Sequence, residues 1–431
     1  MERINKNNVK QIYNGLFNPN TESKIIVFSG RAGDGKTTLS RELAIGMALE
    51  QSKIADVLKS EYNYKFKSKK KGVLHIDADL RKATLRSLVS RVISPEAKSA
   101  SLFDYAAEKK PFKDLIIHTN VDRYKIIGGE QSFRFESYLD NHPEFVENMV
   151  GDISRLVKSK EYNPIIIDVA GSNNTKEIIP FINMADYKFL VTQDEIVSLG
   201  VGRKIILHEL LYSINKKIKD KVTNGLSNDD VKKKLTEIIE SNRDNLDDLY
   251  NSLNKNISKG KVKGEVLGLY KNAINNMAYG LIFSKVSSMG KFLHCQNVFR
   301  DAVHNLTSID GTEEGLKIHN LNGHGLVFDE EIVEKSTNLG ASLILAKYDP
   351  RLHNCHNEEA MTKFFKETKK SDAVNQYDGM AKFIAYNLLT KTHDEFNDGP
   401  EEWRGIEGII GRDKIENNML ESYDNGEENG K

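Results

Sequence analysis

The chain has 431 residues, of which 39% are hydrophobic, 29% are charged and 8 are prolines, a composition that excludes collagen-like and wholly disordered proteins. Lys plus Arg and Asp plus Glu number 62 each, so net charge excludes a global attraction to nucleic acid or anionic lipid. Two cysteines, Cys295 and Cys355, offer at most one disulfide and no zinc ligand set. With no signal-peptide stretch at the start and no apolar run near the ~20 residues that span a bilayer, we expect a cytoplasmic protein.

Seven short apolar runs predict buried strands, and helical patterns separate them. This alternation predicts an α/β fold with a mostly parallel central sheet covered by helices on both faces. The expected strands are residues 24–29, 72–77, 114–119, 163–171, 186–192, 278–286 and 341–347.

The intervals between these strands predict the domain organisation. We expect residues 1–206 and 276–350 to form the two parts of the sheet domain. Residues 207–275, with leucine and isoleucine at helical spacing, read as a helical insertion, and 351–415 as a helical C-terminal extension. The acidic, Gly- and Asn-rich residues 416–431 are typical of a disordered tail.

A glycine-rich motif follows the first expected strand and precedes an amphipathic stretch. It fits GxxxxGK[ST], and Thr38 comes directly after it; the motif is Gly30-Arg31-Ala32-Gly33-Asp34-Gly35-Lys36-Thr37. Between a strand and a helix N-terminus, such a loop turns its backbone N–H groups around a phosphate. Lys36 would reach the β- and γ-phosphate oxygens of a nucleotide, and Thr37 would give its hydroxyl to Mg²⁺.

Carboxylates close two of the later strands. Asp77 and Asp79 stand at the end of the run 72–77, where one could face Mg²⁺ and the other could position water for attack on a γ-phosphate. Asp168 ends the strand Ile165-Ile166-Ile167, and Gly171 follows it. In a phosphate-loop protein, such an Asp holds the hydration shell of Mg²⁺ and the Gly N–H senses the γ-phosphate.

Together these motifs resemble the ParA/MinD family of dimeric ATPases, over roughly residues 24–206 and 276–348. IDADLRKATL is similar to the family's second motif, IIIDVAGS to its third, and GLIFSKV to the strand that ends beside the base. The resemblance implies a P-loop NTPase that hydrolyses ATP with Mg²⁺ and forms an ATP-dependent homodimer. Such a protein acts as a switch in the partitioning or positioning of DNA or a protein cargo.

The resemblance also assigns roles to individual residues. Lys36 and Thr37 match the phosphate and Mg²⁺ residues, Asp77 and Asp168 the acidic groups around the metal, and Asp79 the carboxylate that orients water. Arg31 stands where the family has a signature lysine that reaches the partner's nucleotide. Besides Arg31, three positions depart from the family pattern: Ala32 replaces a loop glycine and requires a negative φ, Ser284 replaces the base-reading Asn, and Phe328 replaces a proline.

Two other readings stay open at this point. One is a metabolic phosphate-loop enzyme, a kinase or an ATP-dependent ligase, which would need a substrate pocket with its own acid or base. The other is a tyrosine kinase of the bacterial type, because DADLRKATL resembles that group as well.

Surfaces for partners are less marked in the sequence. The basic run Lys65–Lys71 could contact DNA phosphates without sequence preference, although such a run is more often a solvated loop. Near the C-terminus, glycines and glutamates around Trp403 argue against a membrane-targeting helix.

Overall fold

The computed structural model describes most of the first 200 residues and scattered segments after them. The described residues are 4, 8–64, 72–82, 84–90, 93, 100–130, 132–171, 175–193, 195–202, 204–206, 208, 209, 212, 213, 233, 234, 237, 238, 241, 246–260, 264, 280–286, 343–347, 381, 384, 385 and 389. The run Lys65–Lys71, Phe328, Trp403, both cysteines and the expected tail lie outside them, as do the expected boundaries at residues 275, 350 and 416.

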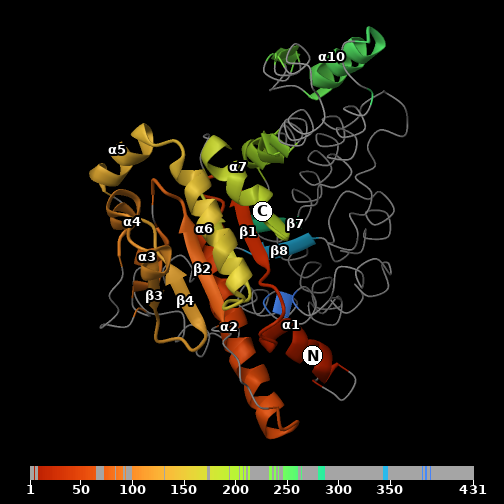
Figure 1. The fold of residues 1–431 in the computed structure, drawn as a ribbon. Helices are drawn as coiled ribbons and strands as arrows, with labels where there is room; N and C mark the ends of the chain where they lie inside the picture. Colours follow the sequence, from red (N-terminus) through yellow and green to blue (C-terminus); the bar gives the residue numbers. More distant parts are fainter. Residues whose placement is uncertain are drawn as a thin grey trace, which may run out of the picture.

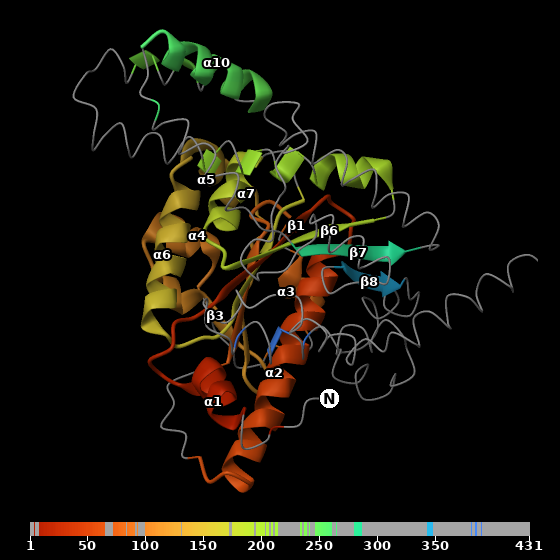
Figure 2. The same ribbon diagram turned by 90° about the vertical axis from the view of Figure 1, so that its right-hand side faces the viewer.

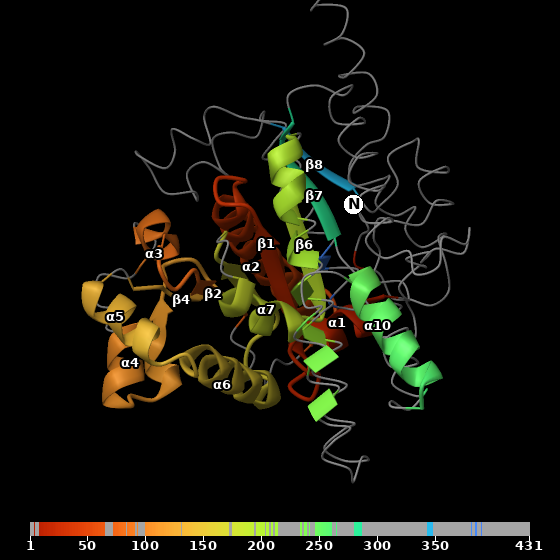
Figure 3. The same ribbon diagram turned by 90° about the horizontal axis from the view of Figure 1, so that it is seen from above.

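An eight-stranded sheet organises the described residues, in the order β3-β4-β2-β5-β1-β6-β7-β8. Every neighbouring pair is parallel except β3 and β4. In Figure 3, β2 and β4 lie on one side of β1, whereas β6, β7 and β8 lie on the other side. The strands are β1 (Ile25–Gly30), β2 (Val73–Ala78), β3 (Ile116–His118), β4 (Tyr124–Ile127), β5 (Ile165–Val169), β6 (Tyr187–Thr192), β7 (Gly280–Val286) and β8 (Leu343–Lys347).

The seven expected strands all occur in this sheet, with one difference and one addition. The run 114–119 supplies β3, which is short, antiparallel and at the edge of the sheet. The additional strand is β4, which lies between β3 and β2. The mostly parallel sheet that the sequence predicts is therefore confirmed.

Helices cover both faces of the sheet (Figures 1 and 2). In β1, Ile25 and Val27 pack in the cluster that includes α4 to α7, whereas Ile26 and Phe28 pack in the cluster that includes α1 and α2. This alternation follows from the two-residue period of a strand. The helical elements are α1 (Val9–Phe17), α2 (Lys36–Ser60), α3 (Leu85–Leu88), α4 (Leu102–Glu108), the 3-10 turn η2 (Phe112–Leu115), α5 (Phe133–Asn141), α6 (Phe145–Ser159), α7 (Thr175–Asn183) and α10 (Leu246–Ser258).

The described residues of the expected insertion and C-terminal extension join these apolar clusters. Ile238 and Leu253 are buried in the cluster on the α6 face. Ala381 and Ile384 are buried in the cluster around α2, and a Cβ placed on Gly46 of α2 would lie 3.0 Å from the Cβ of Ala381. No helix in the described part of the chain is long and apolar enough to cross a membrane.

A buried polar cluster lies between α2 and the sheet. Arg41 Nε donates to Glu42 Oε1 at 2.8 Å, and both side chains are almost completely buried. Beneath them, Nδ1 of His75 and the hydroxyl of Tyr124 are 3.1 Å apart. Burial, with a smaller contribution from Arg41, lowers the pKa of His75 to about 3, so its imidazole is neutral in the folded protein.

Candidate functional site: the phosphate loop and its neighbours

Residues 30–37 form a loop between the carboxyl end of β1 and the N-terminus of α2. The three glycines Gly30, Gly33 and Gly35 all have positive φ, at 143°, 91° and 84°. At Gly30 the neighbouring strand is also close, because a Cβ there would lie 2.1 Å from the carbonyl oxygen of Val191. Ala32 is absent from the described non-glycine residues with positive φ, so alanine is tolerated where the family has glycine. A glycine loop between a strand and a 25-residue helix, in a mostly parallel sheet, is the arrangement of a P-loop NTPase.

The side chain of Lys36 folds back over this loop. Its Nζ donates to the carbonyl oxygen of Arg31 at 2.9 Å, and the residue is 6% exposed. Burial lowers the pKa of Lys36, whereas the charges of Asp168, Asp34 and Asp79 raise it. The ammonium group therefore lies among carboxylates, in a position where a cation can meet the phosphates of a ligand.

The loop touches the end of β5 through Gly171. The backbone N–H of Ala32 donates to the carbonyl oxygen of Gly171 at 3.2 Å. A Cβ on Gly171 would lie 2.3 Å from the nitrogen of Ala32 and 2.6 Å from Nζ of Lys36. Only glycine fits here, since the loop and its lysine pass directly over this position.

Asp168, on β5, is the carboxylate whose charge acts most strongly on the loop lysine. Both of its carboxylate oxygens are buried and have no well-formed hydrogen bond in the described structure. Burial raises the pKa of Asp168 to about 6, and the Lys36 charge and the nearby Thr37 hydroxyl oppose that rise. A buried carboxylate without a well-formed hydrogen bond, beside a threonine hydroxyl, fits Mg²⁺, which binds few protein oxygens and keeps several waters. No group of three or more His, Cys, Asp or Glu side chains in the described residues, this site included, could hold a metal ion on its own, so the proposed Mg²⁺ would also need the threonine hydroxyl and ligand oxygens.

Asp77 lies on β2 directly opposite Asp168 in the sheet register. Its Oδ1 accepts from the backbone N–H of Asp79 at 3.1 Å, and its Oδ2 accepts from that of Leu85 at 2.9 Å. Burial and the charge of Asp168 raise the pKa of Asp77 to about 8. These hydrogen bonds hold the turn that follows β2, and through them Asp77 positions Asp79. The predicted direct bond from Asp77 to Mg²⁺ stays a prediction.

Asp79 directly follows β2, at the start of this turn, and is half-buried. Its Oδ1 accepts from the backbone N–H of Lys82 at 3.1 Å. Its charge acts on both Lys36 and Asp168, which places the carboxylate near the loop. Its predicted role on water stays a prediction.

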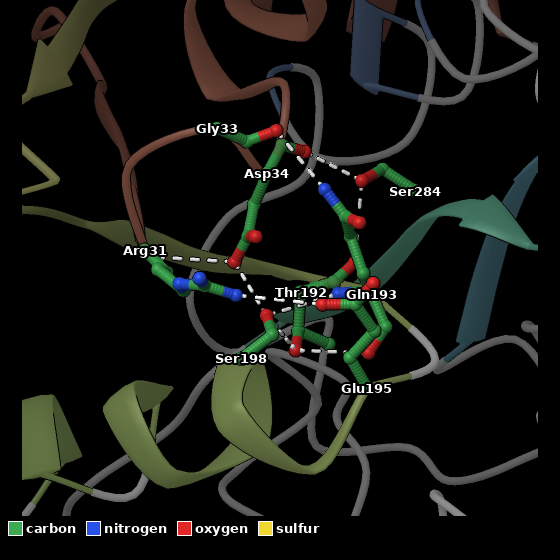
Figure 4. Close-up of polar contacts among 8 residues, drawn as sticks. All are labelled: Arg31, Gly33, Asp34, Thr192, Gln193, Glu195, Ser198 and Ser284. Carbon is green, nitrogen blue, oxygen red and sulfur yellow. Dashed lines mark hydrogen bonds and ion pairs between the residues drawn. The ribbon is translucent and has the colours of Figure 1, made fainter.

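Asp34 joins the loop to the end of β6 (Figure 4). Its Oδ2 accepts from the Arg31 N–H at 3.2 Å and from the Ser198 hydroxyl at 2.5 Å, whereas its Oδ1 is buried without a partner. Ser198 in turn accepts from the Gln193 N–H at 3.1 Å and lies 2.8 Å from the Thr192 hydroxyl. The sequence motifs include Asp34 but do not single out this chain of polar side chains.

Two further contacts in Figure 4 fix the loop from the same side. The amide Nε2 of Gln193 donates to the Gly33 carbonyl oxygen at 3.0 Å. Ser284 on β7 donates its hydroxyl to the Asp34 carbonyl oxygen at 2.5 Å. Ser284 thus supports the loop, and its expected contact with a base stays a prediction.

Arg31 extends to the surface of the loop. Its Nη1 lies 3.4 Å from Oε2 of Glu195, and these side chains are 38% and 50% exposed. Thr38, half-buried, is in the first turn of α2. The structure therefore brings Lys36, Thr37, Asp168, Asp77 and Asp79 to one side of the loop and turns the Arg31 guanidinium outward.

Comparisons with known proteins give structural neighbours only, since no family model and no curated protein matches the chain. The chain is similar to the cell division ATPase MinD of Pyrococcus furiosus, with 14% identity, coverage of 84% of this chain and 98% of that one, and a TM-score of 0.43. MinD of Pyrococcus horikoshii OT3, complexed with Mg-ADP, is also 14% identical, with 86% and 100% coverage and a TM-score of 0.43. An McdA–ATP complex from Cyanothece is 12% identical, with 84% and 96% coverage and a TM-score of 0.42. These solved structures are ParA/MinD-family ATPases, the family that the motifs of this sequence resemble.

Proposed function

We propose that this protein binds ATP with Mg²⁺ at the loop 30–37 and hydrolyses it to ADP and phosphate. The observation that carries the proposal is a buried lysine in the loop whose charge interacts with a buried carboxylate that has no well-formed hydrogen bond. These two groups are Lys36 and Asp168, and a terminal phosphate and its metal would need one group of each kind.

In this proposal the chain's own groups have separate tasks. The loop N–H groups and Lys36 bind the β- and γ-phosphates, and Lys36 exchanges its bond to the Arg31 carbonyl for phosphate oxygens. Thr37 and Asp168 hold the metal, which neutralises charge on those phosphates when it is bound. Asp79 orients the attacking water, because its carboxylate is near the loop yet only half-buried.

We extend the proposal to a nucleotide-dependent homodimer. Lys36 already serves the nucleotide of its own chain, so Arg31 is not needed there. Its guanidinium is more than a third exposed and is paired with an exposed glutamate, an interaction worth little in water. A partner's γ-phosphate in a desolvated interface would bind it more strongly.

The cellular role that we propose is a cytoplasmic switch that positions a cargo, either DNA or a protein. The motif resemblance supports this role. If the surface is DNA, the basic run Lys65–Lys71 is the proposed contact.

The test is nucleotide binding and phosphate release by the Lys36→Ala protein. We expect turnover to fall at least a hundredfold, since the change removes the cation that meets the developing charge, worth about 3 kcal/mol or more in a dry site. Lys53→Ala is the matched control, because Lys53 is an exposed lysine on the same helix. If the Lys36→Ala protein hydrolysed ATP as fast as the wild type, the proposed ATPase site would be wrong.

A further inference from the structure

A cavity of about 360 Å³ lies at the same edge of the sheet as the phosphate loop, but beside different strands. Its walls come from α3, from the start of α4, from β3 and from residues 128–130, which follow β4. We propose that this cavity binds a small anionic ligand with an apolar body, either a carboxylate or a phosphate monoester. Ligands of open α/β sheets bind at the carboxyl ends of the strands, where this cavity lies.

The inner wall of the cavity is apolar. Leu102, Leu115 and Ile117 line it, and each is at most 3% exposed. The exposed hydroxyl-bearing residues Ser87 and Ser90 line it as well. The volume is at the small end of the range for ligand pockets, roughly 300–1,000 Å³, so the ligand is a small molecule rather than a nucleotide.

Arg86 is the one cation among the described residues that line the cavity, and its side chain is exposed. Its aliphatic stem lies along Gly128, because a Cβ on that glycine would be 3.1 Å from Cβ and 3.3 Å from Cδ of Arg86. In the described part of the chain the guanidinium has no ion pair. Its fork of donors matches a carboxylate or a phosphate group.

Glu130, the one acidic side chain among the described residues that line the cavity, forms no ion pair with this arginine. Its Oε2 accepts from the backbone N–H of Phe103 at 2.7 Å, and its Oε1 accepts from the Ser132 hydroxyl at 2.8 Å. Both oxygens therefore already accept hydrogen bonds, one from the backbone and one from a side chain beside the cavity. The guanidinium is left as the group that a ligand would meet, and its charge selects an anion.

The cavity is separate from the phosphate loop but connected to its carboxylates. None of the lining residues belongs to residues 30–37. Yet Leu85, which precedes Arg86, donates its backbone N–H to Asp77 at 2.9 Å. Because no described lining residue belongs to the phosphate loop itself, binding of the anion should persist when Lys36 of that loop is replaced.

The experiment measures binding of three probes to the full-length protein by isothermal titration and ligand-observed NMR. The probes are 3-phenylpropionate, phenyl phosphate and the neutral 3-phenylpropionamide. We expect at least one of the two anions to bind and the amide to bind at least tenfold more weakly. Preference between the anions identifies the ligand as a carboxylate or a phosphate monoester.

Variants then assign the site. Arg86→Gln should weaken anion binding at least tenfold, whereas Arg134→Gln, at an exposed arginine on α5, should leave it unchanged. Lys36→Ala and excess ATP should also leave it unchanged. No binding of either anion, equal binding of the amide, undiminished binding by the Arg86→Gln protein or loss of binding in the Lys36→Ala protein would each overturn the proposal. Circular dichroism confirms that each variant is folded.

Discussion

Oδ2 of Asp34 and Oγ of Ser198 are 2.5 Å apart, although 164 residues separate them in the chain. The bond joins the middle of the phosphate loop to the segment that follows β6. A carboxylate inside such a loop would repel phosphates if it faced them. The Asp34 side chain instead points towards Ser198 and is buried, so we expect its negative charge to lie away from a bound phosphate.

Removing the hydroxyl should therefore weaken nucleotide binding. Ser198→Ala takes one donor from a buried carboxylate whose other oxygen already has no partner, at a cost of about 1–2 kcal/mol. We expect the dissociation constant of a fluorescent ATP analogue to rise about tenfold. Ser154→Ala on α6 is the control, and an unchanged constant in the Ser198→Ala protein would show that the contact does not shape the loop.

Gly171→Ala should disable the same loop from the opposite side. Its Cβ would fall 2.3 Å from the backbone nitrogen of Ala32, so the loop and Lys36 must move. We expect ATP affinity to fall more than tenfold in a protein that is still folded by circular dichroism. Gly151→Ala is the matched control, because that glycine lies in α6 with nothing within 4 Å of the added atom. Equal affinity of the two variants would contradict the close approach of loop and β5.

Asp79→Ala and Arg31→Ala together test the dimer. We expect Asp79→Ala to retain nucleotide but to lose at least a hundredfold in hydrolysis, since the carboxylate acts on water. With ATP and Mg²⁺, and not with ADP, this protein should sediment as a dimer.

Adding Arg31→Ala to Asp79→Ala should return the protein to a monomer with almost unchanged affinity for the nucleotide. Adding Lys53→Ala instead is the control and should leave the dimer intact. If the Arg31→Ala, Asp79→Ala double variant still forms dimers, Arg31 has no role across the interface.

His75 should make stability depend on acidic pH. Its pKa is about 3 in the folded protein and about 6.5 when unfolded, so the unfolded state binds more protons between these values. This contribution is fully present above pH 6.5 and is lost as pH falls towards 3, by roughly 4 kcal/mol. Urea unfolding of wild type and His75→Gln at pH 7 and pH 4 measures it. We expect the wild type to lose more stability than the variant, and parallel losses would refute the assignment.

The sequence predicted the parts of this molecule that depend on local pattern. Long apolar strands and the glycine loop carry strong periodic or positional signals, and the structure confirms the strands. β4 was missed because its four residues, Tyr124–Ile127, are too few to show a period, and the antiparallel direction of β3 follows from its pairing with β4.

In the candidate site, too, the sequence predicted the residues that a local pattern marks and not those that only folding brings together. Lys36 and Asp168 stand out in the sequence because a motif and a strand end mark them. Ser198 and Gln193 contact the loop across at least 160 residues, and only folding brings them together. Asp77 has the expected residue type, but its bond to the Leu85 amide depends on a turn that residue spacing does not define.

The place of β1 between β5 and β6 gives the loop two chemically different sides. Towards β5 and β2 lie the carboxylates Asp168 and Asp77, whereas towards β6 and β7 the loop meets the neutral side chains of Gln193, Ser198 and Ser284. Among the described residues, the Asp34 carboxylate on the second side already accepts from Ser198, so we expect a metal ion on the first side. If the loop binds a nucleotide as we propose, we expect its metal-bearing phosphates to lie towards β5 and its uncharged sugar and base towards β7.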